Sequence, residues 1–256
     1  MTQPSFLVLS GDGINCERET AAAFRVAGAK TDILHINDLA TAPETLMQYD
    51  GMAIPGGFSF GDELGSGQIL ALKIRHAIGP AFFDFIAAGK PIIGICNGFQ
   101  VLVKLGLLPY PETQKRVVAL APNAQGGFTD RWVRLEPVKN SVCKWTEGMD
   151  AFDLPIRHGE GRIVFSDDAI YPELLENGQI ALAYGEDVNG SHQRIAGLCD
   201  PSGLVFGLMP HPEAFAYQAT NPSPQRDFMA AGAGAKIFKN IVTRLTETQK
   251  EKIYAN

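Results

Sequence analysis

The sequence predicts an α/β fold: an open parallel sheet with helices on both faces and a small antiparallel extension. In the first hundred residues, short apolar runs alternate with helical patterns, which is typical of parallel strands joined by crossover helices. The middle of the chain instead has short strand patterns between Gly, Pro and Asn turns, which indicates antiparallel pairing. With 256 residues, 45% of them hydrophobic, the chain can bury one full core, so we expect a single domain over 1–256.

The elements are predicted in chain order from these patterns. The parallel strands are the apolar runs at 6–10, 31–36, 51–55 and 91–96. Helices are expected at 17–27, closed by Gly28, and at 69–88, stopped by Gly89. The extension is expected to hold strands at 117–120, 131–135, 180–184 and 195–199. A buried strand at 204–209 and an amphipathic helix at 226–245 complete the fold, and a polar tail from about 247 is expected to fray.

Charge and composition exclude several classes of protein. The net charge is −6 and the Lys and Arg residues are scattered, which argues against a nucleic-acid partner. The N-terminal apolar run is too short for a signal peptide, and charged residues interrupt the apolar region 74–96, so it cannot span a bilayer. The four cysteines lie far apart without a C-x-x-C pair, so neither a metal site nor a disulfide framework is predicted. We expect a protein of the reducing cytoplasm.

The most informative stretch is Gly94-Ile-Cys96-Asn-Gly98, where an apolar strand runs into a cysteine and then into a helix. A nucleophile at such a sharp turn has a strained backbone, and glycines on either side leave room for its neighbours. The N-terminus of the following helix favours thiolate over thiol, and its free amides, beginning with that of Asn97, can bind a developing oxyanion. Taken alone, the pattern also fits a small buried cysteine that ends a strand.

Cys16 is the rival nucleophile because it too lies between a predicted strand and a helix. Glu17 and Glu19 are expected to raise the pKa of its thiol, and no glycines frame it. We therefore expect a structural role for Cys16 and a catalytic role for Cys96.

A cysteine nucleophile needs a base and a group that orients the base. His211 follows the strand 204–209 as Cys96 follows its own strand, so both are expected at the carboxyl edge of the sheet, where α/β folds bind ligands. Prolines on both sides of His211 are expected to exclude a helix, and in an extended segment residues i and i+2 point the same way. Glu213 should then reach the imidazole of His211 and complete a Cys-His-Glu triad.

Glycine-rich segments mark further candidate binding residues. Gly56 and Gly57 follow the strand 51–55, so an exposed amide there can act as the second oxyanion donor. His158 is a second candidate base, but the glycines around it indicate a loop whose backbone approaches the substrate. No nucleotide phosphate loop is recognisable. Surface or core positions are expected for the other histidines, His35, His76 and His192.

Taken together, these residues resemble the class I, or triad-type, glutamine amidotransferases, and among them the glutaminase subunits of phosphoribosylformylglycinamidine synthase. The resemblance covers nearly the whole chain. It rests on Asn15-Cys16-Glu17, Pro55-Gly-Gly-Phe-Ser-Phe-Gly-Asp62, Gly94-Ile-Cys96-Asn-Gly-Phe-Gln100, His158-Gly-Glu-Gly161 and Met209-Pro-His211-Pro-Glu213. Two features depart from the family pattern: Ala214 stands where an arginine is common, and the region 215–229 is longer than in compact members.

The resemblance implies a flavodoxin-like fold and a glutaminase in which Cys96 attacks the side-chain amide of L-glutamine. A glutamyl thioester and ammonia would form, and water would then release glutamate. The amides of Gly57 and Asn97 would form the oxyanion hole. The substrate-binding residues would be Gly56, Gln100, His158 and Gly159.

The resemblance also implies partners. Ammonia would pass to a synthetase subunit that binds ATP and Mg and amidates formylglycinamide ribonucleotide in purine biosynthesis, with a small accessory subunit in the complex. No cofactor is expected on this chain itself.

Two other interpretations stay open. A stand-alone cysteine hydrolase or glyoxalase-like enzyme of the same architecture also places a cysteine on an elbow, although Glu213 and the Gly56-Gly57 loop favour the amidotransferase. A catalytically idle regulatory subunit is disfavoured by the presence of Cys96, His211 and Glu213. A glutamate-release assay separates an idle subunit from an active one.

Overall fold

The computed structural model describes residues 3–223 and 227–254. The helices are α1 (Glu17–Val26), α2 (Ile36–Thr41), α3 (Gln68–Lys73), α4 (Gly79–Ala87), α5 (Asn97–Lys104), α6 (Ile170–Glu176) and α7 (Ala233–Tyr254). The strands are β1 (Ser5–Ser10), β2 (Lys30–His35), β3 (Gly51–Ile54), β4 (Ile92–Ile95), β5 (Val118–Pro122), β6 (Thr129–Pro137), β7 (Phe152–His158), β8 (Glu160–Phe165), β9 (Ile180–Tyr184), β10 (Ile195–Cys199) and β11 (Val205–Leu208).

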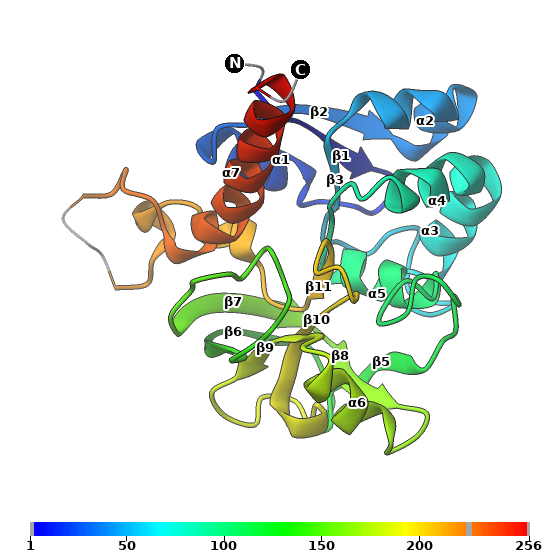
Figure 1. Cartoon of the computed structure of the whole chain (residues 1–256). Coiled ribbons are helices and arrows are strands. Elements are labelled where there is room, and N and C mark those ends of the chain that lie inside the picture. The colour runs from blue at the N-terminus through cyan, green and yellow to red at the C-terminus, as the bar shows by residue number, and fades with distance from the viewer. Residues whose placement is uncertain (1–2, 224–226, 255–256) are drawn as a thin grey trace.

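One sheet of nine strands organises the described residues, in the order β2-β1-β3-β4-β11-β10-β9-β6-β7. The five strands from β2 to β11 in this order are parallel. The remaining four are antiparallel, and β5 and β8 form a separate antiparallel pair. The predicted α/β fold with a parallel sheet and an antiparallel extension is therefore confirmed (Figure 1).

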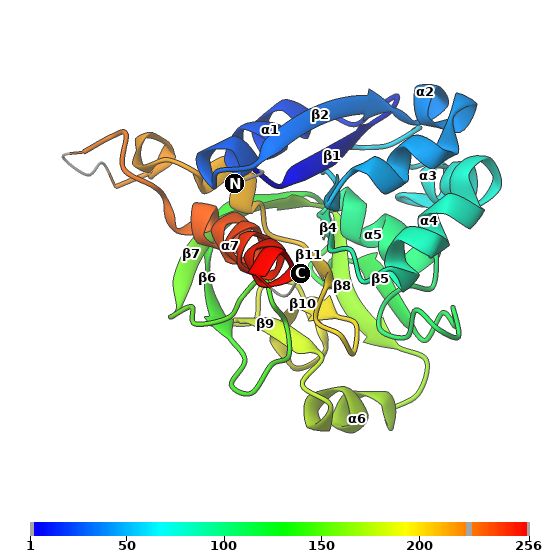
Figure 2. The same cartoon turned by 45° about the horizontal axis from the view of Figure 1, so that its top comes forward.

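Helices cover both faces of the parallel half of the sheet. Helices α1 and α7 lie side by side on one face, and α3, α4 and α5 lie on the other (Figures 1 and 2). All residues of β3, β4 and β11 are buried, as expected for central strands that are covered on both sides. Among the described residues, no helix is both long enough and apolar enough to cross a membrane.

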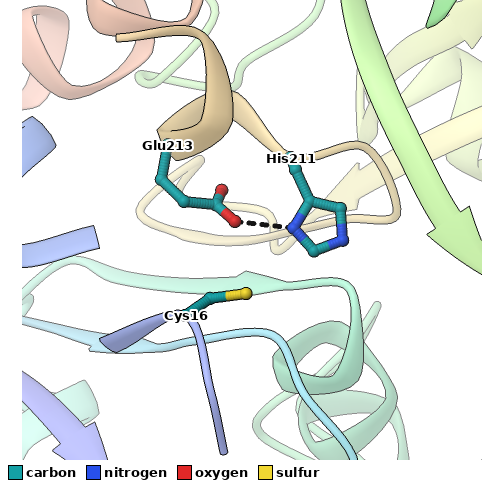
Figure 3. Close-up of side chains that lie close together, drawn as sticks. All are labelled: Cys16, His211 and Glu213. Carbon is teal, nitrogen blue, oxygen red and sulfur yellow. Dashed lines mark hydrogen bonds and ion pairs between the residues drawn. The ribbon is translucent and has the colours of Figure 1, made fainter. Parts of the chain in front are cut away.

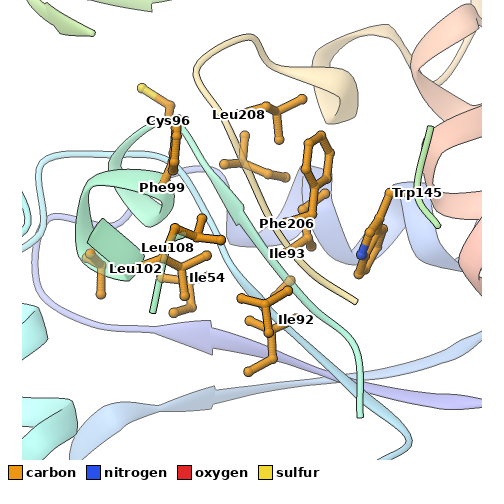
Figure 4. Close-up of a cluster of buried hydrophobic side chains, with 14 of the residues drawn as sticks. Ile54, Ile92, Ile93, Cys96, Phe99, Leu102, Leu108, Trp145, Phe206 and Leu208 are labelled. Carbon is orange, nitrogen blue, oxygen red and sulfur yellow. The ribbon is translucent and has the colours of Figure 1, made fainter. Parts of the chain in front are cut away.

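The hydrophobic core fills both spaces between the sheet and the helices. On the face covered by α1 and α7, Phe6 stacks on Phe24 with ring centroids 4.2 Å apart, and Phe24 meets the edge of Phe238 at 4.8 Å. On the other face, Phe99 of α5 packs against the sheet, and Cys96 stands at the end of this packed cluster (Figure 4). The cysteine is thus supported by a close-packed, rigid core.

Glycines allow α5 to lie directly on the sheet. A Cβ atom added to Gly98 would lie 1.8 Å from the carbonyl oxygen of Ile54, and one added to Gly94 would lie 2.6 Å from the carbonyl oxygen of Gly98. Neither contact is sterically allowed, so only glycine fits at these two positions. The two glycines that frame Cys96 in the sequence therefore make its sharp turn possible.

The helix predicted at 69–88 is wrong as a single helix. The structure has α3, then a π-helical turn at Ile74–Ile78, then α4. At the junction Ile78 leaves helical geometry, with φ −130° and ψ 9°, because Pro80 has no N–H to continue the hydrogen-bond ladder.

Other differences lie outside the apolar periodic segments. The prediction missed α2, a 3₁₀ helix at Pro43–Gln48, the strands β7 and β8, and the helix α6. The last helix begins at Ala233 and not at the predicted position 226. Position 226 itself lies outside the described residues. It continues to Tyr254, so the expectation that the residues from about 247 fray is wrong for the described part.

Candidate active site

The turn between β4 and α5 places Cys96 in a strained conformation. Its φ of +50° and ψ of −105° lie in a region that residues other than glycine rarely adopt. The Cys96 amide donates to the carbonyl oxygen of Leu208 at 2.8 Å, which fixes the turn to β11. Its Sγ lies 3.6 Å from the carbonyl oxygen of Arg157. The side chain is 6% exposed and faces a cavity.

The structure brings His211 and Glu213 together as predicted, but through a different backbone. Nδ1 of His211 lies 2.6 Å from Oε1 of Glu213, and both side chains are buried (Figure 3). Glu213 lies in a short 3₁₀ helix, Pro212–Phe215, and not in an extended segment. The prediction that the prolines exclude a helix is wrong because proline at a first helical position is well tolerated. A hydrogen bond of 2.9 Å from the His211 amide to the carbonyl of Pro155 anchors the histidine to β7.

The surroundings of His211 favour its protonated form. Burial alone would lower the pKa of the imidazole, but the Glu213 carboxylate and the thiols of Cys96 and Cys16 outweigh burial and raise the pKa well above 6.5. Nε2 is buried and has no hydrogen-bond partner among the described residues. His211 therefore has a fixed carboxylate on one nitrogen, and its raised pKa favours transfer of a thiol proton to the other nitrogen, as the base of a cysteine nucleophile requires.

Cys16 lies beside this pair, which the sequence did not predict. Its Sγ, a ring nitrogen of His211 and a carboxylate oxygen of Glu213 all lie within 4.8 Å of one another (Figure 3). The pKa of the Cys16 thiol is raised, mainly by burial and further by Glu213. The expected causes, Glu17 and Glu19, are not the source of this shift. Its Sγ donates to Oδ1 of Asn15 at 3.1 Å.

Only Cys96 of the two thiols lines the adjoining cavity, which measures about 300 Å³. Five predicted site residues line it: Gly57, Cys96, Gln100, His158 and Gly159. Gly56 does not line it, and an added Cβ atom there would be 2.8 Å from Cε1 of His211 and 3.5 Å from both Sγ of Cys16 and Cβ of Cys96. Cys96 therefore faces the cavity and Cys16 does not, and the volume suits a small molecule such as an amino acid.

His158 ends strand β7 and does not lie in a loop, so that part of the prediction is wrong. Its Nδ1 is 3.0 Å from Oδ1 of Asn123, a residue that the sequence analysis did not single out. Burial, together with the charge of His211, lowers the pKa of His158 to about 4. His158 is therefore neutral at pH 7, and it offers the cavity a hydrogen-bonding group without a charge.

Asn97 and Gln100 belong to a buried hydrogen-bond network on the first turn of α5. Nδ2 of Asn97 donates to Oε1 of Gln100 at 2.9 Å, and Nε2 of Gln100 donates to the carbonyl of Glu160 at 2.7 Å. Oδ1 of Asn97 accepts from the amide of Ser59 at 3.1 Å. The network ties α5 to β8 and to the loop that carries Gly57.

Comparison with known proteins identifies close relatives. Residues 3–243 match the family of the CobB/CobQ-like glutamine amidotransferase domain. A Methanococcus maripaludis protein named phosphoribosylformylglycinamidine synthase subunit PurQ is 46% identical over 236 residues, which cover 87% of this chain and 86% of that protein. A protein of the same name from Dehalococcoides mccartyi is 39% identical over 251 residues, which cover 94% of this chain and 98% of that protein.

A solved structure extends the comparison to three dimensions. A chain in the structure of PurLQS from Thermotoga maritima superposes with a TM-score of 0.77 at 34% identity, covering 95% of this chain and 100% of that chain. Similarity in both sequence and fold thus extends over almost the full length.

Proposed function

Because the chain belongs to the CobB/CobQ-like glutamine amidotransferase family, we propose that it is the glutaminase subunit of phosphoribosylformylglycinamidine synthase. It hydrolyses L-glutamine to glutamate and ammonia. The observation that carries the proposal is the placement of Cys96 on a strained turn at the cavity, beside the His211–Glu213 pair. In that pair, Nδ1 of His211 lies 2.6 Å from Oε1 of Glu213. The relatives that bear the PurQ name support the choice of synthase.

The chemistry proceeds through a thioester. The Cys96 thiol gives its proton to Nε2 of His211, and the sulfur attacks the side-chain amide carbon of glutamine. Glu213 holds the other ring nitrogen and stabilises the imidazolium. The tetrahedral intermediate collapses when His211 returns the proton to the leaving nitrogen, so ammonia departs and a glutamyl thioester remains. Water, deprotonated by His211, then hydrolyses the thioester, which releases glutamate and restores the thiol.

Two backbone amides stabilise the oxyanion of this intermediate. The amide of Asn97 is the first of α5, so it has no intrahelical partner and lies at the positive end of the helix. Gly57 lines the cavity on the neighbouring loop, so its amide is the second candidate donor. A preformed pair of such donors lowers the barrier more than any other single feature of an acyl-transfer site.

The cavity has charges of both signs, which suits a zwitterionic amino acid. Asp62, Arg157 and Glu160 all line it. In the part of the chain that the structure describes, Oδ1 of Asp62 is buried without a hydrogen-bond partner. An unpaired carboxylate oxygen is costly to bury, and the α-ammonium group of glutamine supplies the missing partner.

The partner is a synthetase subunit that binds ATP and Mg, because this chain has no phosphate-loop motif of its own. Ammonia is mostly protonated and non-nucleophilic in neutral water, so direct transfer between subunits is needed. Large apolar side chains offer a docking surface: Phe58 and Phe128, which line the cavity, are 48% and 57% exposed, and Leu64, two residues along the chain from the lining residue Asp62, is 73% exposed. A small accessory subunit completes the complex. The four free thiols suit the reducing cytoplasm as its compartment.

The isolated chain is expected to hydrolyse glutamine slowly and to be activated when the nucleotide-loaded synthetase docks. An enzyme active on its own would release ammonia that is protonated before use, so a site completed on docking couples hydrolysis to demand. The gain should appear in kcat more than in KM, because the oxyanion contacts form in the transition state. Steady-state glutamate release, measured with and without the synthetase, its nucleotide and the accessory subunit, tests this expectation.

Phe128→Ala should weaken this activation, because it removes apolar surface from the docking face. Leu175→Ala is the matched control, since Leu175 is 48% exposed on α6 and does not line the cavity. Full activity in the chain alone would contradict the coupling and favour the stand-alone hydrolase. Absence of glutamate in every mixture would favour the idle subunit.

A further inference from the structure

We propose that the loop 11–16, between β1 and α1, is a positioning element that holds the Gly56–Gly57 peptide in the orientation the oxyanion hole requires. This inference rests on the proposed function and extends it to a segment with no assigned role. The loop includes Asn15 and Cys16, part of a motif that the mechanism leaves unused. It acts through its backbone, so its residues are positioning residues and not catalytic ones.

The contact that carries the proposal is made to a single carbonyl group. The amides of Asn15 and Cys16 both donate to the carbonyl oxygen of Gly56, each at 3.3 Å. That carbonyl and the N–H of Gly57 belong to the same peptide unit. A peptide unit is planar and trans, so its C=O and N–H point in opposite directions. By holding the oxygen on its own side, the loop directs the Gly57 N–H away from itself.

The backbone amides of residues 58–60, which follow Gly57 in the chain, are all hydrogen-bonded within the protein, whereas among the described residues the Gly57 amide is not. The amide of Phe58 donates to the carbonyl of Gly13 at 2.8 Å, and that of Phe60 donates to the carbonyl of Asp12 at 2.7 Å. The amide of Ser59 donates to Oδ1 of Asn97 at 3.1 Å. Within 3–223 and 227–254, the Gly57 amide has no such acceptor.

The loop 11–16 and the Asn97 side chain therefore hold the segment 56–60 from two sides. Of the amides at 57–60, only the one at the cavity is left to bind a ligand. A free amide whose peptide partner accepts two hydrogen bonds is also a stronger donor, because hydrogen bonds in a chain polarise one another.

Close backbone contact makes this arrangement sensitive to a single methyl group. Gly13 has φ +83°, and a Cβ atom added there would lie 2.1 Å from the carbonyl oxygen of Phe58. A Cβ atom added to Gly57, which has φ +147°, would lie 2.6 Å from the carbonyl oxygen of Gly13. A side chain at position 13 must therefore push the segment 56–60 away and turn the Gly57 peptide.

The test compares Gly13→Ala with Gly28→Ala in the reconstituted complex. Gly28 also has a positive φ, +99°, but an added Cβ atom there meets nothing within 4 Å, so this control carries the backbone strain without the displacement. Loss of one oxyanion donor typically lowers kcat by about 10²–10³-fold. We expect Gly13→Ala to lose glutamine hydrolysis by roughly this factor with KM changed by less than about threefold, and Gly28→Ala to stay near wild type.

A second readout separates positioning of the oxyanion hole from general damage. Alkylation of Cys96 by iodoacetamide, followed by peptide mass spectrometry, depends on the thiolate but forms no oxyanion. Its rate should be unchanged in Gly13→Ala. Asn97→Ala, which removes the acceptor for the Ser59 amide on the other side of the segment, should show the same loss of kcat with intact alkylation.

Several outcomes would overturn the inference. It is wrong if Gly13→Ala hydrolyses glutamine as fast as Gly28→Ala, or if alkylation falls together with kcat. If Gly13→Ala does not fold, Asn15→Pro, which removes one of the two amides that donate to the Gly56 carbonyl, decides in the same way. Failure of the wild-type complex to release glutamate would instead reject the proposed function on which the inference rests.

Discussion

Cys96→Ala is expected to abolish glutamine-dependent activity and to leave ammonia-supported amidation by the reconstituted complex nearly unchanged. Removal of a covalent nucleophile lowers kcat by about 10⁴–10⁶-fold, because the thioester route is lost and binding alone gives little catalysis. The amidation itself takes place on the synthetase and needs only ammonia. Product formation from glutamine and from an ammonium salt, measured on the same preparation, gives the glutamine-dependent rate and the ammonia-supported rate.

Cys16→Ala is the matched control for this substitution. Both thiols lie near His211, but only Cys96 lines the cavity and ends a strand at a positive φ. Cys16→Ala should therefore retain glutamine hydrolysis. If Cys16→Ala loses hydrolysis and Cys96→Ala keeps it, the assignment of the nucleophile is wrong.

His211→Ala is expected to be the second most damaging change, and Glu213→Gln a milder one. His211 transfers the proton, whereas Glu213 orients and charges the base without taking a proton itself. By analogy with other triads, loss of the orienting carboxylate should cost roughly 10- to 100-fold less in kcat than loss of the base. Steady-state kcat for both variants, each in complex with the synthetase, measures the difference. Equal rates for Glu213→Gln and wild type across the working pH range would remove Glu213 from the mechanism.

The same pair predicts how stability depends on pH. The folded protein raises the pKa of His211 well above 6.5, so it holds a proton that the unfolded chain releases. This contribution to the free energy of unfolding is fully present below pH 6.5 and is lost as the pH rises through the higher folded value. Glu213→Gln removes the carboxylate, so this part of the pH dependence should shrink. Urea unfolding at a series of pH values detects the change.

Motifs in the sequence were sufficient to predict the parallel strands of the sheet and the contact between His211 and Glu213. Strands β9 and β10 are found with the predicted bounds, because their apolar runs are bounded by clear turn residues. The glycines beside Cys96 were informative because close packing of a helix on a sheet excludes every other residue type.

Other parts of the site depend on tertiary contacts that no local pattern encodes. Cys16 reaches His211 only because the loop after β1 lies against the Gly56–Gly57 segment. Asn123 orients His158 from a segment 35 residues away. Strand β7, which carries His158, contains a proline and was missed because it lies at the edge of the sheet, where proline is tolerated.

The most direct test of the central claim, that Cys96 is the nucleophile of a glutaminase, is covalent labelling with a diazoketone analogue of glutamine. The reagent must bind as glutamine does and then be attacked by the nucleophile, so one measurement tests substrate and residue together. Peptide mass spectrometry should find a single adduct on Cys96, and excess glutamine should protect against its formation. An adduct on Cys16, or labelling of Cys96 that glutamine does not slow, would contradict the account.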